Sequence, residues 1–113
     1  MSASALKQRL RADLKAAMQG RATGEVRLLR TLIAALDNAE AVPGENTYVP
    51  RSFGDPGAEV ARRELDEAAI SALLVSEVAA RLAAAADYER HGETHEAARL
   101  RQEAKLIERY RGS

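Results

Sequence analysis

Residues 26–40 read VRLLRTLIAALDNAE and contain the clearest structural pattern in the chain. Val26, Leu29, Leu32, Ile33 and Leu36 recur every three or four residues, the spacing that puts side chains on one face of an α-helix. We therefore predict an amphipathic helix over about residues 24–40.

The sequence upstream of this helix has the same periodicity. Leu6, Leu10, Leu14 and Ala17 predict a helix over about residues 4–19, with Gly20 as its C-terminal stop. Because only a few residues connect the two helices, they must run antiparallel as a hairpin.

A second hairpin is predicted downstream. One helix covers about residues 66–91, with Asp66 as N-cap, and another covers about residues 94–110, with a tight turn at Gly92. The apolar positions of these helices are Ile70, Leu73, Leu74, Val78, Leu82, Ala85 and Tyr88 in the first, and Ala97, Leu100, Ala104, Ile107 and Tyr110 in the second. The predicted fold class is all-α, four helices as two antiparallel hairpins.

Residues 41–65 form a long loop between the hairpins, because this stretch holds all three prolines of the chain and three of its seven glycines. Loops this long are uncommon in compact domains. We interpret Tyr48 and Phe53 as anchors that dock the loop onto the bundle, with a disordered tether as the alternative. Asp55 and Pro56 could also open a short helical turn.

Length and composition limit the classes of protein to consider. A chain of 113 residues suits one domain spanning residues 1–113. Seventeen basic residues balance seventeen acidic ones, so binding to nucleic acid would need a local basic patch. The chain has no cysteine, and we find neither a secretory signal nor a membrane span, so we expect a cytoplasmic protein without membrane contact.

Three charged residues fall on apolar faces of the second hairpin. A helical projection places Glu77 and Arg81 within the apolar arc of one helix and Glu103 within that of the other. A hairpin turning at Gly92 brings Arg81 opposite Glu103, with Glu77 one helical turn away. We predict a buried cluster of these three side chains. It could fix the register of the hairpin or supply a carboxylate to a cleft, or the projection could be wrong by a residue.

Basic residues gather on the first hairpin. Lys7, Arg11 and Lys15 form a stripe opposite the leucines, and Arg27 and Arg30 face away from the core of the next helix. These five side chains are candidates for phosphate contacts with a nucleic acid. The alternative is an ordinary solvated face.

Catalytic and metal-binding signatures are weak. His91 and His95 flank a helix-breaking glycine instead of lying on one helical turn, which disfavours a metal site. We recognise no nucleotide-binding loop, nucleophile motif or triad. We therefore assign no catalytic residue, no metal and no cofactor.

Several short patterns, in order, resemble the GatB/YqeY family. They are Leu6, Leu10, Asp13, Leu14, Lys15, Ala17 and Met18, then Leu28 to Arg30 and Asn38 to Glu40, then Glu77, Val78 and Arg81, Tyr88 and Gly92, and finally Glu103, Ile107, Glu108 and Tyr110. The resemblance covers the family's first helical subdomain only. The loop at 41–65 is about a dozen residues longer than the family's usual link.

The resemblance implies a tRNA-facing role. The YqeY-like proteins are similar to the tail of the GatB component of the glutamine-dependent aminoacyl-tRNA amidotransferase, a carbon-nitrogen ligase whose amide transfer occurs in other domains. A non-catalytic module with tRNA or a tRNA-handling enzyme as its partner is implied. The alternative is a protein-interaction or structural domain without a nucleic-acid role.

Overall fold

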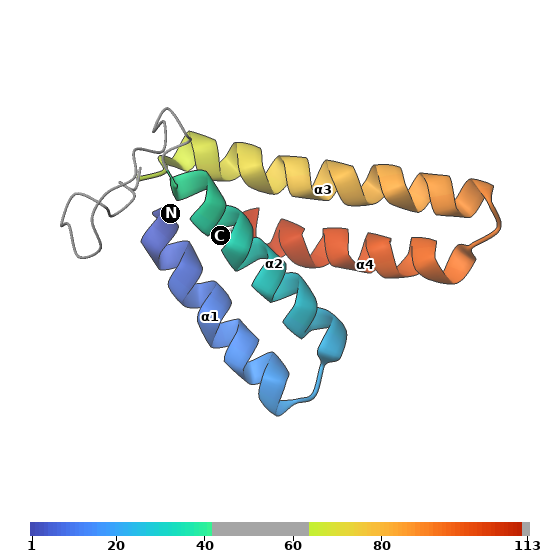
Figure 1. Ribbon diagram of the computed structural model, residues 1–113, viewed down its shortest axis with the longest axis horizontal. Helices are drawn as coiled ribbons and strands as arrows, with labels where there is room; N and C mark the ends of the chain where they lie inside the picture. Colours follow the sequence, from blue (N-terminus) through green and yellow to red (C-terminus); the bar gives the residue numbers. More distant parts are fainter. Residues whose placement is uncertain (42–63, 112–113) are drawn as a thin grey trace, which may run out of the picture.

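A computed structural model describes residues 1–41 and 64–111 of the chain. It contains helices α1 (Ala3–Gln19), α2 (Thr23–Glu40), α3 (Glu67–Arg90) and α4 (Thr94–Arg111). Helix α1 packs against α2 and α3 packs against α4, which confirms the all-α fold of two hairpins. The hairpins meet where α1 begins and α4 ends, and they spread apart toward their turns (Figure 1).

Capping side chains define where the helices begin. The Ser2 hydroxyl accepts a hydrogen bond from the Ala5 amide at 3.0 Å, and the Asp66 carboxylate accepts one from the Ala69 amide at 2.8 Å. Each satisfies an amide that has no partner within its own helix. Asp66 is therefore the N-cap that the sequence predicts.

The two hairpin turns use the left-handed backbone region differently. Gly92 occupies it in the α3–α4 turn, with a φ of 76°. In the α1–α2 turn Gly20 is the C-cap with a φ of −83°, and Arg21 takes the left-handed conformation with a φ of 55°. A side chain in this region costs roughly 1 to 2 kcal/mol.

All four helices contribute to one hydrophobic core where the hairpins meet. Its fully buried side chains include Leu6 and Leu10 of α1, Leu32 and Leu36 of α2, and Ile107 of α4. From the α3 side the core is completed by Leu65, Ile70, Leu74 and Val78. The apolar spacing of residues 26–40 therefore corresponds to real burial.

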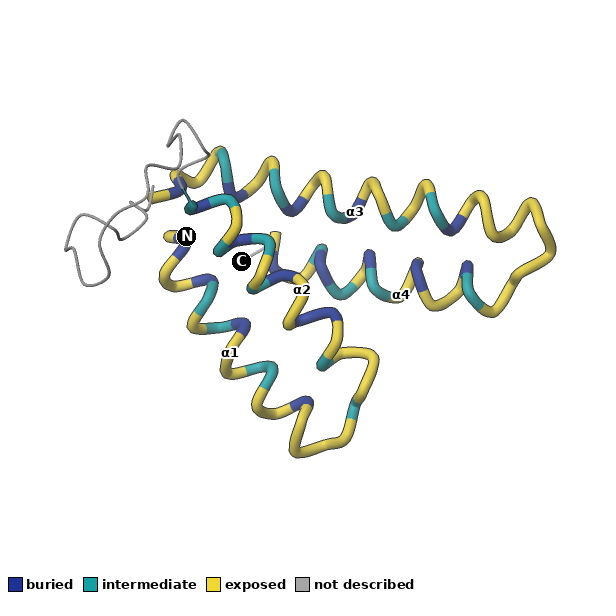
Figure 2. Tube along the Cα trace, viewed as in Figure 1, coloured by how far each residue is buried: buried dark blue, intermediate teal, exposed yellow. Residues whose placement is uncertain are grey.

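Beyond this core the α3–α4 hairpin extends alone, and fewer of its residues are buried there (Figure 2). Only a small cluster of buried residues continues there, formed by Ala85, Ala97 and Leu100. Leu82 and Tyr88 are 47% and 41% exposed, so their expected places in the apolar face are wrong. Figure 1 shows the α1–α2 hairpin spreading away from α3 toward the α3–α4 turn.

Helix α3 is apolar on nearly all sides. By length and composition it could cross a membrane, since an 18-residue window within it has a mean hydropathy of 1.6, which departs from our expectation that no stretch resembles a span. The helix of a soluble domain can satisfy the same criterion. In the structure 22% of that window is buried, and Ile70, Leu74 and Val78 are among the residues that pack against the other helices.

Candidate functional site

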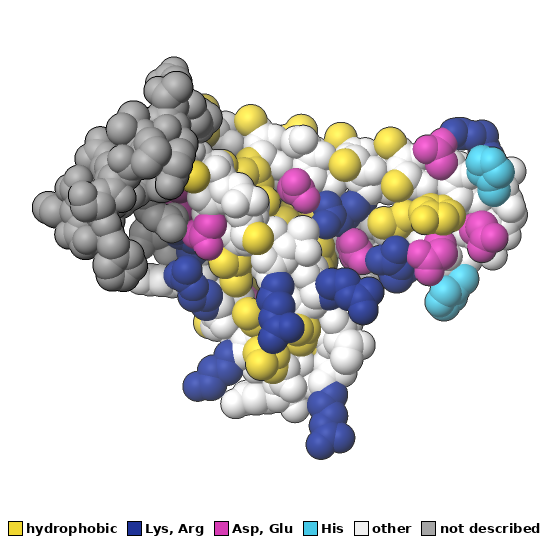
Figure 3. Space-filling view, in the orientation of Figure 1, with side chains coloured by type: hydrophobic (Ala, Val, Ile, Leu, Met, Phe, Trp, Pro, Cys, Tyr) yellow, Lys and Arg dark blue, Asp and Glu magenta, His cyan; other side chains and the backbone are white. Residues whose placement is uncertain are grey.

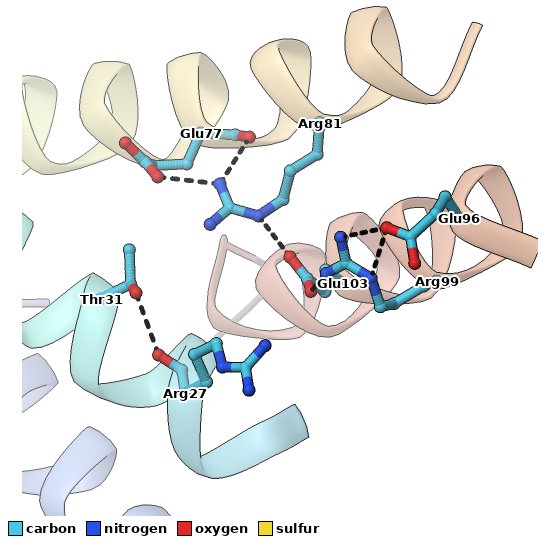
Figure 4. A network of polar contacts seen from close by, with 7 residues as sticks. All are labelled: Arg27, Thr31, Glu77, Arg81, Glu96, Arg99 and Glu103. Atoms are coloured by element: carbon cyan, nitrogen blue, oxygen red, sulfur yellow. Dashed lines mark hydrogen bonds and ion pairs between the residues drawn. The ribbon is translucent and has the colours of Figure 1, made fainter. Parts of the chain in front are cut away.

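The cluster Glu77, Arg81 and Glu103 joins α3 to α4 (Figure 4). Arg81 Nη1 donates to Glu77 Oε1 at 2.8 Å and to the Glu77 carbonyl at 3.1 Å, and Nε donates to Glu103 Oε1 at 3.0 Å. The Arg81 side chain is only 14% exposed. The structure therefore brings together the three residues that the helical projection pairs.

Arg99 extends this cluster along α4 (Figure 4). It bridges Glu103 Oε2 at 2.6 Å and Glu96 Oε2 at 2.8 Å. The hydrogen bond from Arg99 lowers the pKa of Glu96, and the same bond raises the pKa of Arg99. Each Glu103 oxygen thus accepts from an arginine, so this carboxylate is suited to holding the hairpin in register and poorly suited to act as a base.

Lys7 lies between the first two helices instead of on an open basic surface. Its Nζ pairs with Asp37 at 3.2 Å and with Glu40, and its side chain is 15% exposed. The hydrogen bond to Glu40 is the main reason that the pKa of Lys7 is raised. The antiparallel register of the first hairpin brings Lys7 close to Asp37 and Glu40. Sequence spacing could therefore have predicted this contact, as it predicted the contact of Arg81 with Glu103 in the second hairpin.

The other four candidate bases, Arg11, Lys15, Arg27 and Arg30, are exposed on the α1–α2 hairpin. Arg21, which the sequence did not single out, joins them at the hairpin turn. Among the described residues none of these five side chains forms an ion pair. Within the described part of the chain, the first hairpin therefore carries a set of positive charges without an ion-pair partner.

Three of these arginines line a shallow groove beside the turn of the hairpin. The groove has a volume of about 780 Å³ and is lined by Met18, Arg21, Thr23, Val26, Arg27, Arg30, Thr31 and Ala34. We call this surface the basic groove. Its lining has no acidic residue, and Figure 3 shows basic side chains over this hairpin with apolar surface between them.

Apolar and hydroxyl groups form the floor of the basic groove. Met18 is 51% exposed, and its sulfur lies 4.0 Å from Arg30 Nη2. The Thr31 hydroxyl donates to the Arg27 carbonyl at 2.9 Å (Figure 4). A surface with an apolar floor and guanidinium groups at its edges can contact both phosphates and the faces of bases or sugars.

A second hollow of about 380 Å³ lies where α1, α2 and the end of α4 meet. Tyr110 Oη donates to Asp13 Oδ2 at 2.5 Å, and the Arg9 guanidinium lies 4.7 Å from the centre of the Tyr110 ring. Burial, followed by the hydrogen bond to Asp13, raises the pKa of Tyr110. Sequence spacing could not find this contact, because it depends on how the two hairpins meet.

The remaining sequence candidates do not form a site in the described part of the chain. His91 Nδ1 lies 2.8 Å from the Asp87 carbonyl in its own helix. Within residues 1–41 and 64–111 no three His, Asp or Glu side chains are grouped to hold a metal ion. The proposed loop anchors Tyr48 and Phe53 lie outside the described residues.

Comparison with known proteins finds no matching family model, no similar curated protein and no similar solved structure. The resemblance to the GatB/YqeY family stays a prediction, carried by the sequence patterns alone. The basic groove is therefore the feature from which function is best argued.

Proposed function

We propose that this chain is a non-catalytic, cytoplasmic helical module that binds tRNA or a similarly structured RNA through the basic groove. The observation that carries the proposal is the set of three arginines at the turn of the α1–α2 hairpin, Arg21, Arg27 and Arg30, which form no ion pair with any described residue. Phosphate contacts from such side chains supply most of the affinity of proteins for nucleic acids. The resemblance to an amidotransferase tail agrees with tRNA as the partner.

The distribution of charge supports this surface over others. Residues 1–41 carry seven basic and four acidic side chains, whereas residues 64–111 carry seven basic and ten acidic ones. Most acidic groups of the first hairpin are also occupied, since Asp37 and Glu40 hold Lys7 and Asp13 accepts from Tyr110. A polyanion would thus meet the first hairpin with the turn and its arginines foremost.

The conformation of Arg21 gives independent support. A left-handed residue in a turn is most stable as glycine, so an arginine there lowers stability. Residues held in such conformations concentrate at functional sites. We interpret the Arg21 side chain as a phosphate contact.

The test measures binding of a fluorescently labelled tRNA across a range of salt concentrations. Replacing Arg21, Arg27 and Arg30 by Gln should lower affinity at low salt and reduce the slope of log K against log salt by about 2 to 3. A matched control replaces Arg90, Arg101 and Lys105, three exposed bases of the second hairpin, and should leave the slope nearly unchanged. Equal losses in both variants, or no binding by the native chain at low salt, would refute the proposal.

Two single replacements sharpen the test. Arg21→Gly should raise the free energy of unfolding by up to about 1 kcal/mol while weakening RNA binding, because relief of backbone strain and loss of charge act separately. Lys7→Ala should lower stability and leave the salt slope unchanged, because Lys7 is already paired with Asp37 and Glu40. RNA binding that depends on Lys7 as strongly as on Arg30 would contradict this assignment.

A further inference from the structure

Two rows of side chains run along α2 inside the basic groove. Residues four positions apart lie on the same face of a helix. The lining residues of α2 therefore form a polar row and a mainly apolar row, with Thr23, Arg27 and Thr31 in the first and Val26, Arg30 and Ala34 in the second. Together the rows extend about 17 Å along the helix axis. The groove thus offers polar contacts on one side and apolar contacts on the other.

The mainly apolar row continues onto α1 through Met18. The Met18 sulfur lies 4.0 Å from Arg30 Nη2, and Met18 is 51% exposed. The described lining of the groove has no aromatic side chain, but a thioether and a guanidinium group both make favourable contacts with aromatic rings. A nucleobase that lies over Met18 and Val26 therefore removes apolar surface from water on both sides of the contact.

An unpaired base can make this contact, and a base in a double helix cannot. In an A-form RNA duplex the bases are stacked and paired, and the major groove is too deep and narrow for side chains to read. A duplex on the basic groove would leave Met18 and Val26 facing ribose and phosphate groups. A single strand instead presents the face of a base to them, while its neighbouring phosphates contact the arginines of the lining.

Thr31 in the polar row can only accept a hydrogen bond from a ligand. Its hydroxyl donates to the Arg27 carbonyl at 2.9 Å (Figure 4), so only the lone pairs of its oxygen are left. In this state Thr31 cannot donate to a phosphate oxygen. The ribose 2′-hydroxyl is a donor that RNA has and DNA lacks. Thr31 therefore matches a ribose better than a deoxyribose.

We infer that the basic groove binds an unpaired ribonucleotide of single-stranded RNA, with the base on Met18 and Val26 and the ribose at Thr31. This inference rests on the proposed function and narrows the partner to the unpaired segments that a folded RNA carries in its loops and at its ends. The three arginines of the lining supply the phosphate contacts. The groove volume of about 780 Å³ lies within the range of clefts that hold small organic groups.

Fluorescence anisotropy with three labelled probes tests the inference. The probes are an unstructured RNA strand of about twelve nucleotides, the same strand annealed to its complement, and a DNA strand of the same sequence. The native chain should bind the single RNA strand about tenfold more tightly than the duplex, and about threefold more tightly than the DNA strand. Because the duplex carries more phosphates than the single strand, charge alone predicts the opposite order for the two RNA probes.

Two variants assign the contacts. Met18→Gln keeps the length of the side chain and adds no charge, so affinity for the single RNA strand should fall about five- to tenfold with an unchanged salt slope. The matched control is Leu82→Gln, which alters an apolar side chain of similar exposure, 47%, on the second hairpin and should leave affinity unchanged. Thr31→Val keeps the shape of the side chain but has no acceptor, so the preference for RNA over DNA should disappear without weaker DNA binding.

The outcomes separate this inference from the proposed function. Duplex binding as tight as single-strand binding, or an unchanged affinity of Met18→Gln, would overturn the inference and leave RNA binding by the arginines intact. Equal affinity of the native chain for the RNA and DNA strands would overturn the assignment of a ribonucleotide. Binding of none of the three probes at low salt would refute the proposed function, and the inference with it.

Discussion

Arg81 joins the two helices of the second hairpin through a mostly buried guanidinium. Its guanidinium bonds to Glu77 and Glu103 at a place where all three side chains are mostly shielded from water. A charge in such a place is stable only while its partners remain. The cluster therefore favours one register of α3 against α4 and penalises any shifted one.

We expect Arg81→Met to lower the free energy of unfolding by about 3 kcal/mol, because two half-buried carboxylates lose their shared partner. Urea denaturation measures the loss. The control is Arg101→Met, since Arg101 pairs with Glu89 between the same two helices but is 46% exposed. Its loss should be below about 1 kcal/mol. Similar losses in both variants would mean that the Arg81 cluster is no more than a surface contact.

Tyr110 should make stability fall at high pH. Burial and the bond to Asp13 raise the pKa of Tyr110 above its ordinary value of 10.0. Below that pH the phenol is protonated in the folded and unfolded chains alike, and its contribution is complete. Above it the unfolded chain releases the proton and the folded chain keeps it, so the free energy of unfolding decreases as pH rises. Lys7, whose pKa is also raised above its ordinary 10.5, adds a decrease of the same sign.

Tyr110→Phe isolates the tyrosine's part of this effect. The variant should lose about 1 to 2 kcal/mol at pH 8, where the hydrogen bond to Asp13 is missing. Between pH 8 and pH 11 its free energy of unfolding should then decrease less than that of the native chain, as measured by urea denaturation at each pH. If the free energy of unfolding of Tyr110→Phe decreased with pH as steeply as that of the native chain, groups other than Tyr110 would be responsible for the loss of stability at high pH.

At the level of elements, two glycines with different backbones should respond oppositely to the same replacement. Gly92 has a φ of 76°, and Gly24 lies in the first turn of α2. An added Cβ meets nothing within 4 Å at either position, so only backbone preference distinguishes them. Gly92→Ala should lower the free energy of unfolding by about 1 to 2 kcal/mol, and Gly24→Ala should raise it by about 0.5 to 1 kcal/mol.

Thermal and urea denaturation of both variants measure these changes. If both replacements changed the free energy of unfolding equally and in the same direction, the α3–α4 turn would tolerate a side chain at position 92. The left-handed backbone of Gly92 would then not be the reason for glycine there. The pair needs no further control, because each variant adds one methyl group to an open position.

The helices could be predicted from the sequence to within one residue at each end, because apolar spacing and capping side chains are local signals. The Arg81 cluster could be predicted for the same reason, since a tight turn fixes the register of a hairpin. The contact between Tyr110 and Asp13 could not, because it joins different hairpins. The exposure of Leu82 could not be predicted either, because a local apolar pattern does not say which positions the other helices cover.

At the scale of the whole molecule, the α3–α4 hairpin has two parts. Its first part shares the core with α1 and α2 through Ile70, Leu74 and Val78. Its second part has only the cluster of Ala85, Ala97 and Leu100. The bonds of Arg81 lie between these parts along α3. The far end of the hairpin is therefore held by its own backbone bonds, a few apolar contacts and the exposed ion pair between Arg101 and Glu89.

We expect this far end to open locally without global unfolding. Regions with few buried apolar contacts exchange their amide hydrogens through low-energy openings, whereas core amides exchange only on global unfolding. Hydrogen exchange followed by mass spectrometry should show faster exchange in peptides from residues 83–100 than in peptides from residues 28–36.

Two leucine replacements decide whether the parts are independent. Leu100→Ala should speed exchange in residues 83–100 and leave residues 28–36 nearly unchanged, because Leu100 belongs to the small cluster. Leu32→Ala, in the fully buried part of α2, should lower global stability by about 2 to 5 kcal/mol and speed exchange in every helix. If Leu100→Ala instead accelerated exchange equally in all four helices, the hairpin would unfold as one unit. The Arg81 cluster would then not act as a boundary.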